Sequence, residues 1–321
     1  MALIRCILFL VCLLVINVLQ AQSINPDKSI TIVVPYPAGG TLDRLARIIA
    51  PELGAQLFNS VIVENRPGGN GSIGVEHVIR SRPDGKTILL TNSPLNANQM
   101  LFDEKQEFQD KLQPVIQLTN NKFILVVNSD TNVKSIFELK QYAKTRKGGI
   151  NCAGVATYSY LLCHSLDRAI GNVVVVPYKG IAPATIAVMS GEVDVFFMEA
   201  GNLQVIEGVS RVRAIAISSA KDLKLPYRAL PLLSQWSPRF KLIDPYYAVF
   251  VPNGTSTEMI LMLNQAFNSV LSKPSIGKRL RENDITIAGG SVQVLEDSMS
   301  REAATIERDY PELKRPGRLS R

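Results

Sequence analysis

The feature that most constrains the fold is an alternation between short apolar runs and longer segments with helical periodicity. Residues 30–35 form an apolar run typical of a buried strand, and the next segment carries its apolar residues on one helical face, at Leu42, Leu45, Ile49 and Leu53. Similar short runs predict strands at residues 61–64, 87–90, 123–127, 173–176, 193–197, 213–217 and 247–251. Strands that alternate with helices indicate parallel sheets with crossover helices, so we expect an α/β fold.

The N-terminus has the pattern of a secretory signal peptide. Arg5 precedes an apolar stretch over residues 6–19, which is shorter than the ~20 residues that a membrane-spanning helix needs. Ala21 is a small residue suited to cleavage, so we expect residues 1–22 to be removed and the mature protein to be periplasmic. An uncleaved anchor remains an alternative, because Leu19 is bulky for the cleavage site.

The size and charge of the mature chain limit its architecture and partners. Removing 22 of the 321 residues leaves 299, which is too many for one ordinary core and suits two lobes. The formal charge of +7 loses only Arg5 with the leader, which favours the attraction of anionic ligands. The basic residues are scattered rather than gathered into a stripe with aromatic residues, so we expect no binding of nucleic acid.

Cysteine and histidine usage argues against a metal centre or a nucleophilic enzyme. The leader holds two of the four cysteines, which leaves Cys152 and Cys163, and spacing alone does not decide whether these two form a disulfide. The only histidines are His77 and His164, and neither lies in a metal-ligand or nucleophile-elbow context. We therefore expect no metal, no cofactor and no enzymatic activity, with a hydrolase as the less favoured alternative.

The segment with most chemical content is residues 35–43, between the first strand and its helix. Gly39 and Gly40 remove side-chain bulk, so a ligand can approach main-chain N–H groups at the positive end of the helix dipole. Asp43 lies in the first turn, where a carboxylate caps free N–H groups, and we favour this capping role over ligand contact. The turn lacks the lysine of a phosphate loop and the glycine spacing of a dinucleotide site.

Several separated segments, taken together, resemble the substrate-binding proteins of tripartite tricarboxylate transporters, the Bug-type family. They occur in order at residues 36–43, 63–74, 83–90, 176–184, 191–197 and 212–221. The resemblance implies a type II periplasmic-binding-protein fold, in which two α/β lobes joined by crossing strands close on a ligand like a Venus flytrap. The first lobe would take residues 23–122 plus 223–321 and the second residues 123–222.

The resemblance also implies a function and a ligand site. The protein would be a monomer that captures a small organic acid or amino-acid-like ligand for a membrane transporter, or alternatively for a sensor protein. The expected seat of the ligand carboxylate comprises Tyr36, Ala38, Gly39, Gly40, Thr41 and Asp43. The other walls would come from Asn92, Ser93, Thr157, Ser159, Tyr160, Tyr178, Ala182 and Pro183, although a helix-capping role for Thr157 or Ser159 and a core role for Tyr178 remain open.

The sequence departs from the family pattern where it bears on ligand identity. Ala156 and Tyr160 replace residues that are usually Gly and His, and Met198 and Glu199 replace a pair that is usually Asp-Asn. If Glu199 faces the cleft, it would repel a second ligand carboxylate and accept an amine or amide. Glu199 could equally be a solvated loop acid. The Ser-rich, basic C-terminal end looks degenerate, which leaves open a loss of binding.

Overall fold

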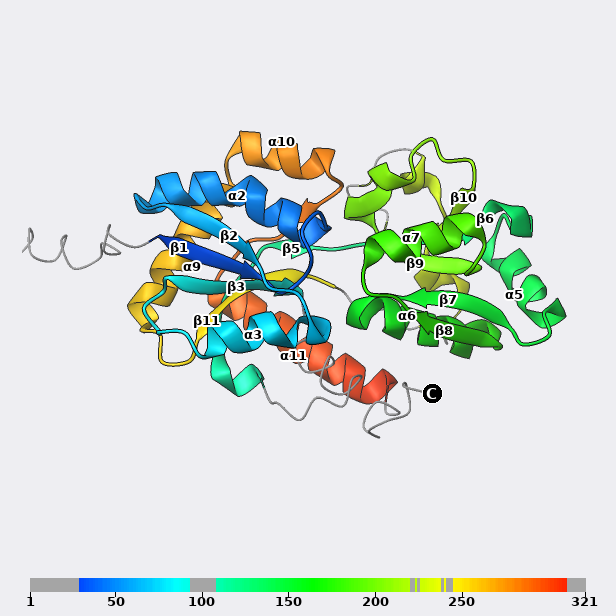
Figure 1. Cartoon of the computed structure of the whole chain (residues 1–321), viewed down its shortest axis with the longest axis horizontal. Coiled ribbons are helices and arrows are strands. Elements are labelled where there is room, and N and C mark those ends of the chain that lie inside the picture. The colour runs from blue at the N-terminus through cyan, green and yellow to red at the C-terminus, as the bar shows by residue number, and fades with distance from the viewer. Residues whose placement is uncertain are drawn as a thin grey trace, which may run out of the picture.

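The computed structural model describes residues 29–92, 108–219, 223, 226–237, 240 and 245–310. Figure 1 shows them in two lobes, each built on one five-stranded sheet, which confirms the predicted two-lobed α/β fold. The leader at residues 1–22 and Ser93 lie outside the described residues. Among the described helices, none is long and apolar enough to cross a membrane.

The first sheet has the strand order β2-β1-β3-β11-β4. Its strands are β1 (Ile30–Val34), β2 (Val61–Asn65), β3 (Thr87–Asn92), β4 (Leu112–Gln117) and β11 (Tyr247–Pro252). The first three strands are parallel, whereas β11 lies antiparallel between β3 and β4. The helices of this part are α2 (Thr41–Leu57), α3 (Ser72–Ile79), α9 (Thr257–Leu271), α10 (Pro274–Glu282) and α11 (Val292–Asp309).

The second sheet repeats this plan with the order β8-β7-β9-β6-β10. Its strands are β6 (Phe123–Asn128), β7 (Ile150–Gly154), β8 (Val173–Pro177), β9 (Val195–Glu199) and β10 (Val212–Ile217). Again three strands are parallel, and β6 lies antiparallel between β9 and β10. The accompanying helices are α5 (Ile136–Thr145), α6 (Ala156–Ile170), α7 (Ile181–Ser190) and α8 (Leu233–Trp236), with a 3₁₀ segment η4 (Ala200–Val205) after β9.

This shared plan determines where a ligand can bind. In each sheet the first parallel strand along the chain is followed by a helix. Strand β1 is joined to α2 by a short loop, and β7 is joined to α6 by one residue. Ligands of open α/β sheets bind beyond the carboxyl ends of the parallel strands, where backbone N–H groups of the following helices are free. Both faces of each sheet are covered by apolar clusters, so these strand ends are the part of each sheet open to a ligand.

Two passes of chain join the lobes and hydrogen bond to each other. Residues 118–122 lead from β4 to β6, and the return pass enters β11 at Tyr247. The amide of Leu118 donates to the Tyr247 carbonyl at 2.8 Å, and the amide of Asn121 donates to the Pro245 carbonyl at 2.7 Å. The passes therefore form a paired hinge. It is extended by a two-stranded sheet of β5 (Thr119–Asn120) and β12 (Thr286–Ile287).

The C-terminal third differs most from the expectations. Leu233 and Phe240 pack in the core of the second lobe, with the Phe240 ring 5.9 Å from that of Phe197, so the chain stays with this lobe well past residue 223. The C-terminal end, which was expected to depart from the family pattern, forms α11. The residue after this helix, Tyr310, contacts the second lobe. The Tyr310 ring lies 4.4 Å from the Arg168 guanidinium, and its hydroxyl lies 2.8 Å from that of Ser165. The basic residues after 310 lie outside the described part of the chain.

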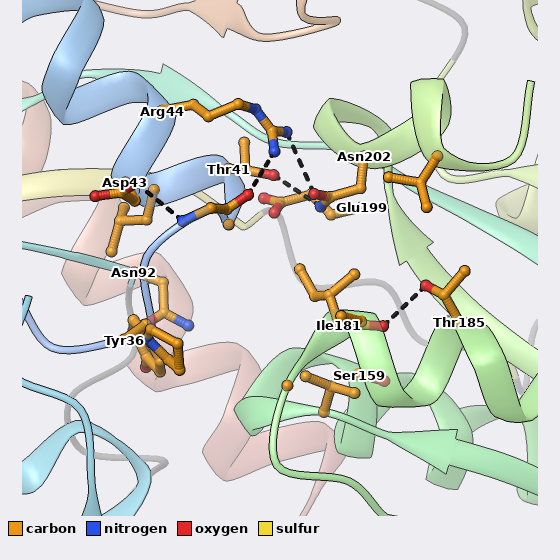
Figure 2. Close-up of a pocket in the computed structure, with 18 of the residues that line it drawn as sticks. Tyr36, Thr41, Asp43, Arg44, Asn92, Ser159, Ile181, Thr185, Glu199 and Asn202 are labelled. Atoms are coloured by element: carbon orange, nitrogen blue, oxygen red, sulfur yellow. Dashed lines mark hydrogen bonds between the residues drawn. The ribbon is translucent and has the colours of Figure 1, made fainter.

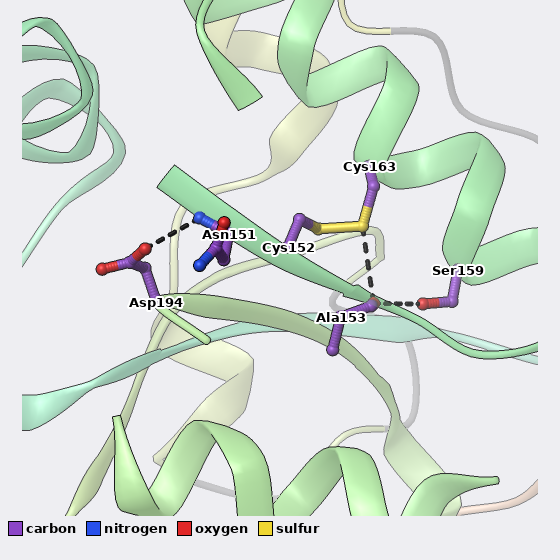
Figure 3. The surroundings of a disulfide bond; sticks show 6 residues. All are labelled: Asn151, Cys152, Ala153, Ser159, Cys163 and Asp194. Carbon is purple, nitrogen blue, oxygen red and sulfur yellow. Dashed lines mark hydrogen bonds between the residues drawn. A yellow bond between two sulfur atoms is a disulfide. The ribbon is translucent and has the colours of Figure 1, made fainter. Parts of the chain in front are cut away.

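A disulfide, left open by the sequence, links β7 to α6. Cys152 and Cys163 form this bond with their Cα atoms 5.9 Å apart, and both side chains are completely buried (Figure 3). On the same side, the Ser159 hydroxyl donates to the Ala153 carbonyl at 2.9 Å. The bond and this contact together hold the first turns of α6 against the strand that precedes it.

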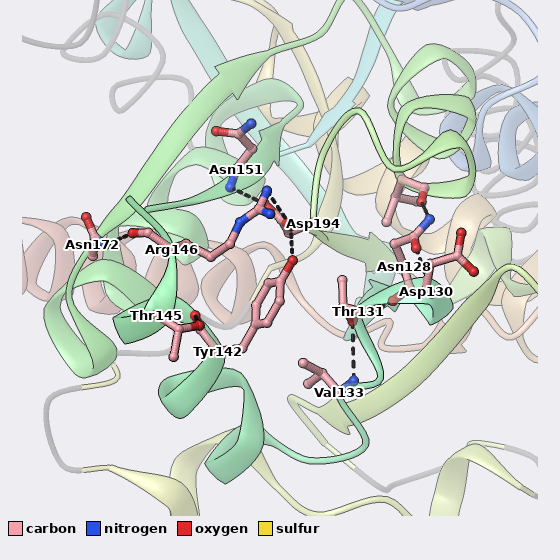
Figure 4. A network of polar contacts seen from close by, with 11 residues as sticks. Asn128, Asp130, Thr131, Val133, Tyr142, Thr145, Arg146, Asn151, Asn172 and Asp194 are labelled. Atoms are coloured by element: carbon pink, nitrogen blue, oxygen red, sulfur yellow. Dashed lines mark hydrogen bonds and ion pairs between the residues drawn. The ribbon is translucent and has the colours of Figure 1, made fainter. Parts of the chain in front are cut away.

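A buried acidic side chain ties the second sheet together at the edge away from the carboxyl ends of its parallel strands (Figure 4). Asp194, just before β9, accepts hydrogen bonds from the Asn151 amide at 2.7 Å and the Tyr142 hydroxyl at 3.1 Å. The guanidinium of Arg146 lies 3.8 Å from the same carboxylate. All its contacts are internal, which gives Asp194 a structural role.

Candidate ligand-binding site

A cavity of about 390 Å³ lies between the lobes, and its lining comes from both of them. Figure 2 shows Tyr36 and Asn92 on one side of this cavity and Ser159, Ile181 and Thr185 across it. Within the described residues no group of His, Cys, Asp or Glu side chains is arranged to hold a metal ion. The polar groups of the described lining are backbone amides, hydroxyls, side-chain amides and a few charged side chains.

The loop before α2 is held in place by Asp43. The Gly39 amide donates to Asp43 Oδ2 at 2.9 Å, and Arg47 Nε donates to both carboxylate oxygens. Burial alone would raise the pKa of Asp43, but the hydrogen bonds from Arg47, Gly39 and Asn65 outweigh it and lower the pKa below 3.8. Asp43 is thus ionised, and its carboxylate holds the amide of Gly39, which precedes the N-cap residue Gly40, rather than capping the first turn of α2.

This contact changes the expected role of Gly39. Its amide already donates to Asp43, so Gly39 shapes the turn, at φ +89°, rather than offering a free N–H group. Gly40 is the N-cap residue of α2 and supplies no side-chain cap. The amides of the first helical turn, from Thr41 and Leu42, lack intrahelical acceptors and are available to an anion.

The second lobe presents two more helix N-termini to the cavity. Val155 caps α6 and Gly180 caps α7, and neither end has a side-chain cap. Two hydroxyls on this side donate to their own backbone, Ser159 to Ala153 and Thr185 to the Ile181 carbonyl at 2.8 Å, and the Tyr158 hydroxyl donates to Glu302. Three helix dipoles therefore place positive potential in the cavity without a buried lysine.

The floor of the cavity is a polar network that joins the lobes. Glu199, at the end of β9, accepts a hydrogen bond from the Tyr247 hydroxyl of β11. Asn202 donates to the Thr41 hydroxyl at 2.7 Å. The guanidinium of Arg44 donates to the carbonyls of Gly39 and Gly201 and to the Asn202 side chain.

Most of the predicted site residues line the cavity. They are Tyr36, Ala38, Gly39, Gly40, Thr41, Asp43, Asn92, Ser159, Ala182, Pro183 and Glu199. The Tyr36 hydroxyl donates to the Asn92 side-chain oxygen at 2.6 Å, which fixes the ring as one wall. Glu199 is only 9% exposed and is therefore not a solvated loop acid.

Three predicted residues lie away from the cavity lining. Thr157 is completely buried, and Tyr160 packs in the core of the second lobe against Gly154. Tyr178 is partly exposed and donates its hydroxyl to Glu192 at 2.6 Å. The helical rotation of α6 explains the first two, because a helix that presents Tyr158 and Ser159 to the cavity turns Thr157 and Tyr160 inward.

Sequence reasoning missed several lining residues. Arg44 follows Asp43 directly, so its place in the first turn of α2 was a usable signal. No local pattern indicated Tyr247 or Asn202, because they come from a strand and a 3₁₀ segment far away in the sequence. The apolar lining residues Phe123, Val155 and Val205 were likewise not predicted.

Comparisons with known proteins agree with this architecture. A family model described as tripartite tricarboxylate transporter family receptor matches residues 45–309. The chain is 30% identical over 288 residues to a UPF0065 protein from the tcbD-tcbE intergenic region of Pseudomonas sp. strain P51, covering 87% of this chain and 84% of the relative. It is also 30% identical to protein BugT of Bordetella pertussis strain Tohama I, with 78% of each chain covered.

A solved structure is similar over nearly its whole length. The structure of Rpa4515 from R. palustris with adipate superposes with a TM-score of 0.79 and 26% identity, covering 88% of this chain and 98% of Rpa4515. The order of elements, the cavity between the lobes and these matches confirm the resemblance inferred from the loop motifs. The chain belongs to the tripartite tricarboxylate transporter family of receptors.

Proposed function

We propose that this protein is a periplasmic solute-binding protein that captures a small carboxylate-bearing ligand by closing its lobes, for a transporter of the tripartite tricarboxylate type. The observation that carries the proposal is the meeting of three uncapped helix N-termini, those of α2, α6 and α7, in one cavity between the lobes. Backbone amides there can hold a carboxylate, and contacts from both lobes favour the closed form. Rpa4515, a similar protein, has been solved with adipate.

The finer parts of this proposal concern location, lobes and partners. Residues 1–22 act as a signal peptide cleaved near Ala21, and the mature protein works as a monomer. The first lobe takes residues 23–122 and the chain from β11 onward, and the second takes residues 123–240. The packing of Leu233 and Phe240 supports this later boundary. Delivery to a sensor protein is the alternative, because it uses the same binding chemistry.

The proposal excludes covalent chemistry on the ligand. The hydroxyls of Ser159 and Thr185 donate to carbonyls, so no base is placed to activate them. His164 lies on α6 and His77 on α3, and neither lines the cavity. A hydrolase would turn over esters or amides, whereas a binding protein returns its ligand unchanged.

A thermal-shift screen of carboxylates, amino acids and aromatic acids, each beside its methyl ester, tests the proposal. A ligand at a free concentration of 100 times its Kd stabilises the folded state by about 2.7 kcal/mol. At least one acid should therefore raise Tm by several degrees. Its ester should not, because it lacks the charge that the helix ends attract. Mass spectrometry of molecules retained after gentle purification should recover the same acid. Equal shifts with acid and ester, or turnover of the ester, would contradict the proposal.

A further inference from the structure

Glu199 lines the cavity as well as joining the lobes through the Tyr247 hydroxyl. Two acidic side chains line the cavity among the described residues, and Asp43 is committed to the Gly39 amide and Arg47. Glu199 lies at the carboxyl end of β9, 9% exposed, with its carboxyl group beside Thr41 and Asn202 (Figure 2). A ligand seated at the start of α2 therefore lies in the same cavity as this carboxyl group.

The contacts of Glu199 leave it able to accept further hydrogen bonds. A carboxylate has about four lone-pair positions. The Tyr247 hydroxyl donates to Oε2, and the Thr41 hydroxyl also contributes a hydrogen bond. The remaining positions can accept from an N–H or O–H group of a ligand, and an ammonium N–H group makes one of the stronger hydrogen bonds to a carboxylate.

The charges around Glu199 make a second ligand carboxylate costly. Burial raises the pKa of Glu199 to about 7, although the hydroxyls of Tyr247 and Thr41 and the charge of Arg44 oppose this shift, so Glu199 repels a second carboxylate most strongly above pH 7, where it is ionised. Arg44 is the competing group, because it also lines the cavity and carries a full positive charge; its guanidinium is oriented by hydrogen bonds to the Gly39 carbonyl at 2.8 Å, to the Gly201 carbonyl and to Asn202. Lys179, the other basic residue of the lining, is exposed.

The space between the two polar ends of the cavity is apolar. Phe123 and Val155 contribute to it, as do Ile181 and Pro183 at the start of α7. The hydroxyls of Ser159 and Thr185 donate to their own backbone and that of Tyr158 donates to Glu302, so the protons of these three hydroxyls are already committed. Apolar walls with a few convergent polar groups fix the orientation of a ligand.

We propose that Glu199 determines specificity by rejecting a second carboxylate and accepting an N–H group, so that the ligand is a monocarboxylate carrying an amide or ammonium group on an apolar body. This inference rests on the proposed function, because the ligand's one carboxylate must occupy the start of α2. The apolar body lies against α7, and the nitrogen group reaches the cavity floor.

Two matched series of acids test the inference by titration calorimetry at pH 8, where Glu199 is largely ionised. One series is hexanoate, adipate, adipic acid monoamide and 6-aminohexanoate, and the other is butyrate, succinate, succinic acid monoamide and 4-aminobutyrate. Within each series only the end group changes. The proteins are the wild type, Glu199→Gln and Glu207→Gln, where Glu207 is an exposed acid of the same lobe outside the cavity lining.

In the wild type, a nitrogen-bearing acid should bind at least about tenfold more tightly than the dicarboxylate of its series. Glu199→Gln should reduce this preference by about tenfold or more, and Glu207→Gln should leave it within about threefold. The glutamine still accepts from Tyr247, so Tm should change little. Tighter binding of a dicarboxylate by the wild type, or an unchanged preference in Glu199→Gln, would overturn the inference.

The outcomes separate this inference from the proposed function. If acids bind and Gly40→Val weakens them but Glu199→Gln leaves the preference unchanged, only the inference about Glu199 fails. If no acid of either series binds and the retained molecule carries no carboxylate, both fail. If the wild type prefers a dicarboxylate and Arg44→Gln abolishes that preference, Arg44 rather than Glu199 selects the end group of the ligand at the cavity floor.

Discussion

Replacing Gly40 with valine is expected to weaken ligand binding by about 100-fold, because two charge-assisted hydrogen bonds from the start of α2 are worth about 3 kcal/mol. Gly40 lies between the loop and the helix, and the ligand must approach its backbone closely to reach the amides of Thr41 and Leu42. A branched side chain there covers these amides. Titration calorimetry with the acid found by thermal shift measures the effect.

The geometry at Gly40 makes this variant a clean test. Its φ of −73° and ψ of 170° suit any residue, and an added Cβ would meet only the Pro37 carbonyl, at 3.8 Å. The ligand-free Tm should therefore stay close to that of the wild type, and Gly40→Ala should show a smaller loss of affinity than Gly40→Val. Wild-type affinity in a folded Gly40→Val protein would show that the carboxylate is held elsewhere.

Removing the disulfide by Cys152→Ala together with Cys163→Ala is expected to lower the free energy of unfolding by about 3 kcal/mol. The bond closes a loop with a sequence separation of 11 and so restricts the unfolded chain. Both sulfurs are fully buried between β7 and α6, and their loss also removes packing in the core of the second lobe. Urea unfolding of the oxidised wild type and the double variant measures the difference.

Reduction provides the control for this prediction. A reductant should destabilise the wild type by a similar amount and leave the double variant unchanged, because that variant has no bond to reduce. The start of α6 lines the cavity, so the double variant should also bind its ligand less tightly. A count of free thiols confirms that the reduced sample has lost the disulfide. Equal unfolding free energies for the oxidised and reduced wild type would then show that the bond does not stabilise the protein.

Local sequence patterns predicted the most buried strands well and the last helix, α11, poorly. Strands β1, β3 and β6 are short apolar runs buried on both faces, so their residues alone indicate them. Helix α11 was missed because its surface is mostly polar and only a few residues, such as Leu295 and Ile306, are buried. The position of α11 depends on residues that are distant in the sequence. Tyr310, which follows α11, forms a hydrogen bond with Ser165.

The site shows the same division between local and distant information. The turn at Gly39 and Gly40 and the structural role of Asp43 depend on neighbouring residues, and in the structure Asp43 holds the Gly39 amide. The pairing of Glu199 with Tyr247 joins residues 48 positions apart and from different lobes, which no local pattern reveals. Family resemblance predicts that the loop is the carboxylate seat, but it could not show that the Gly39 amide already donates to Asp43.

The central claim is that main-chain amides at the start of α2 hold a ligand carboxylate inside a cavity that both lobes close. A crystal structure of the protein with its retained small molecule tests this most directly. The account predicts a carboxylate oxygen within about 3 Å of an amide nitrogen of Gly40, Thr41 or Leu42, directly or through one ordered water. A ligand bound with no carboxylate near these amides would contradict it.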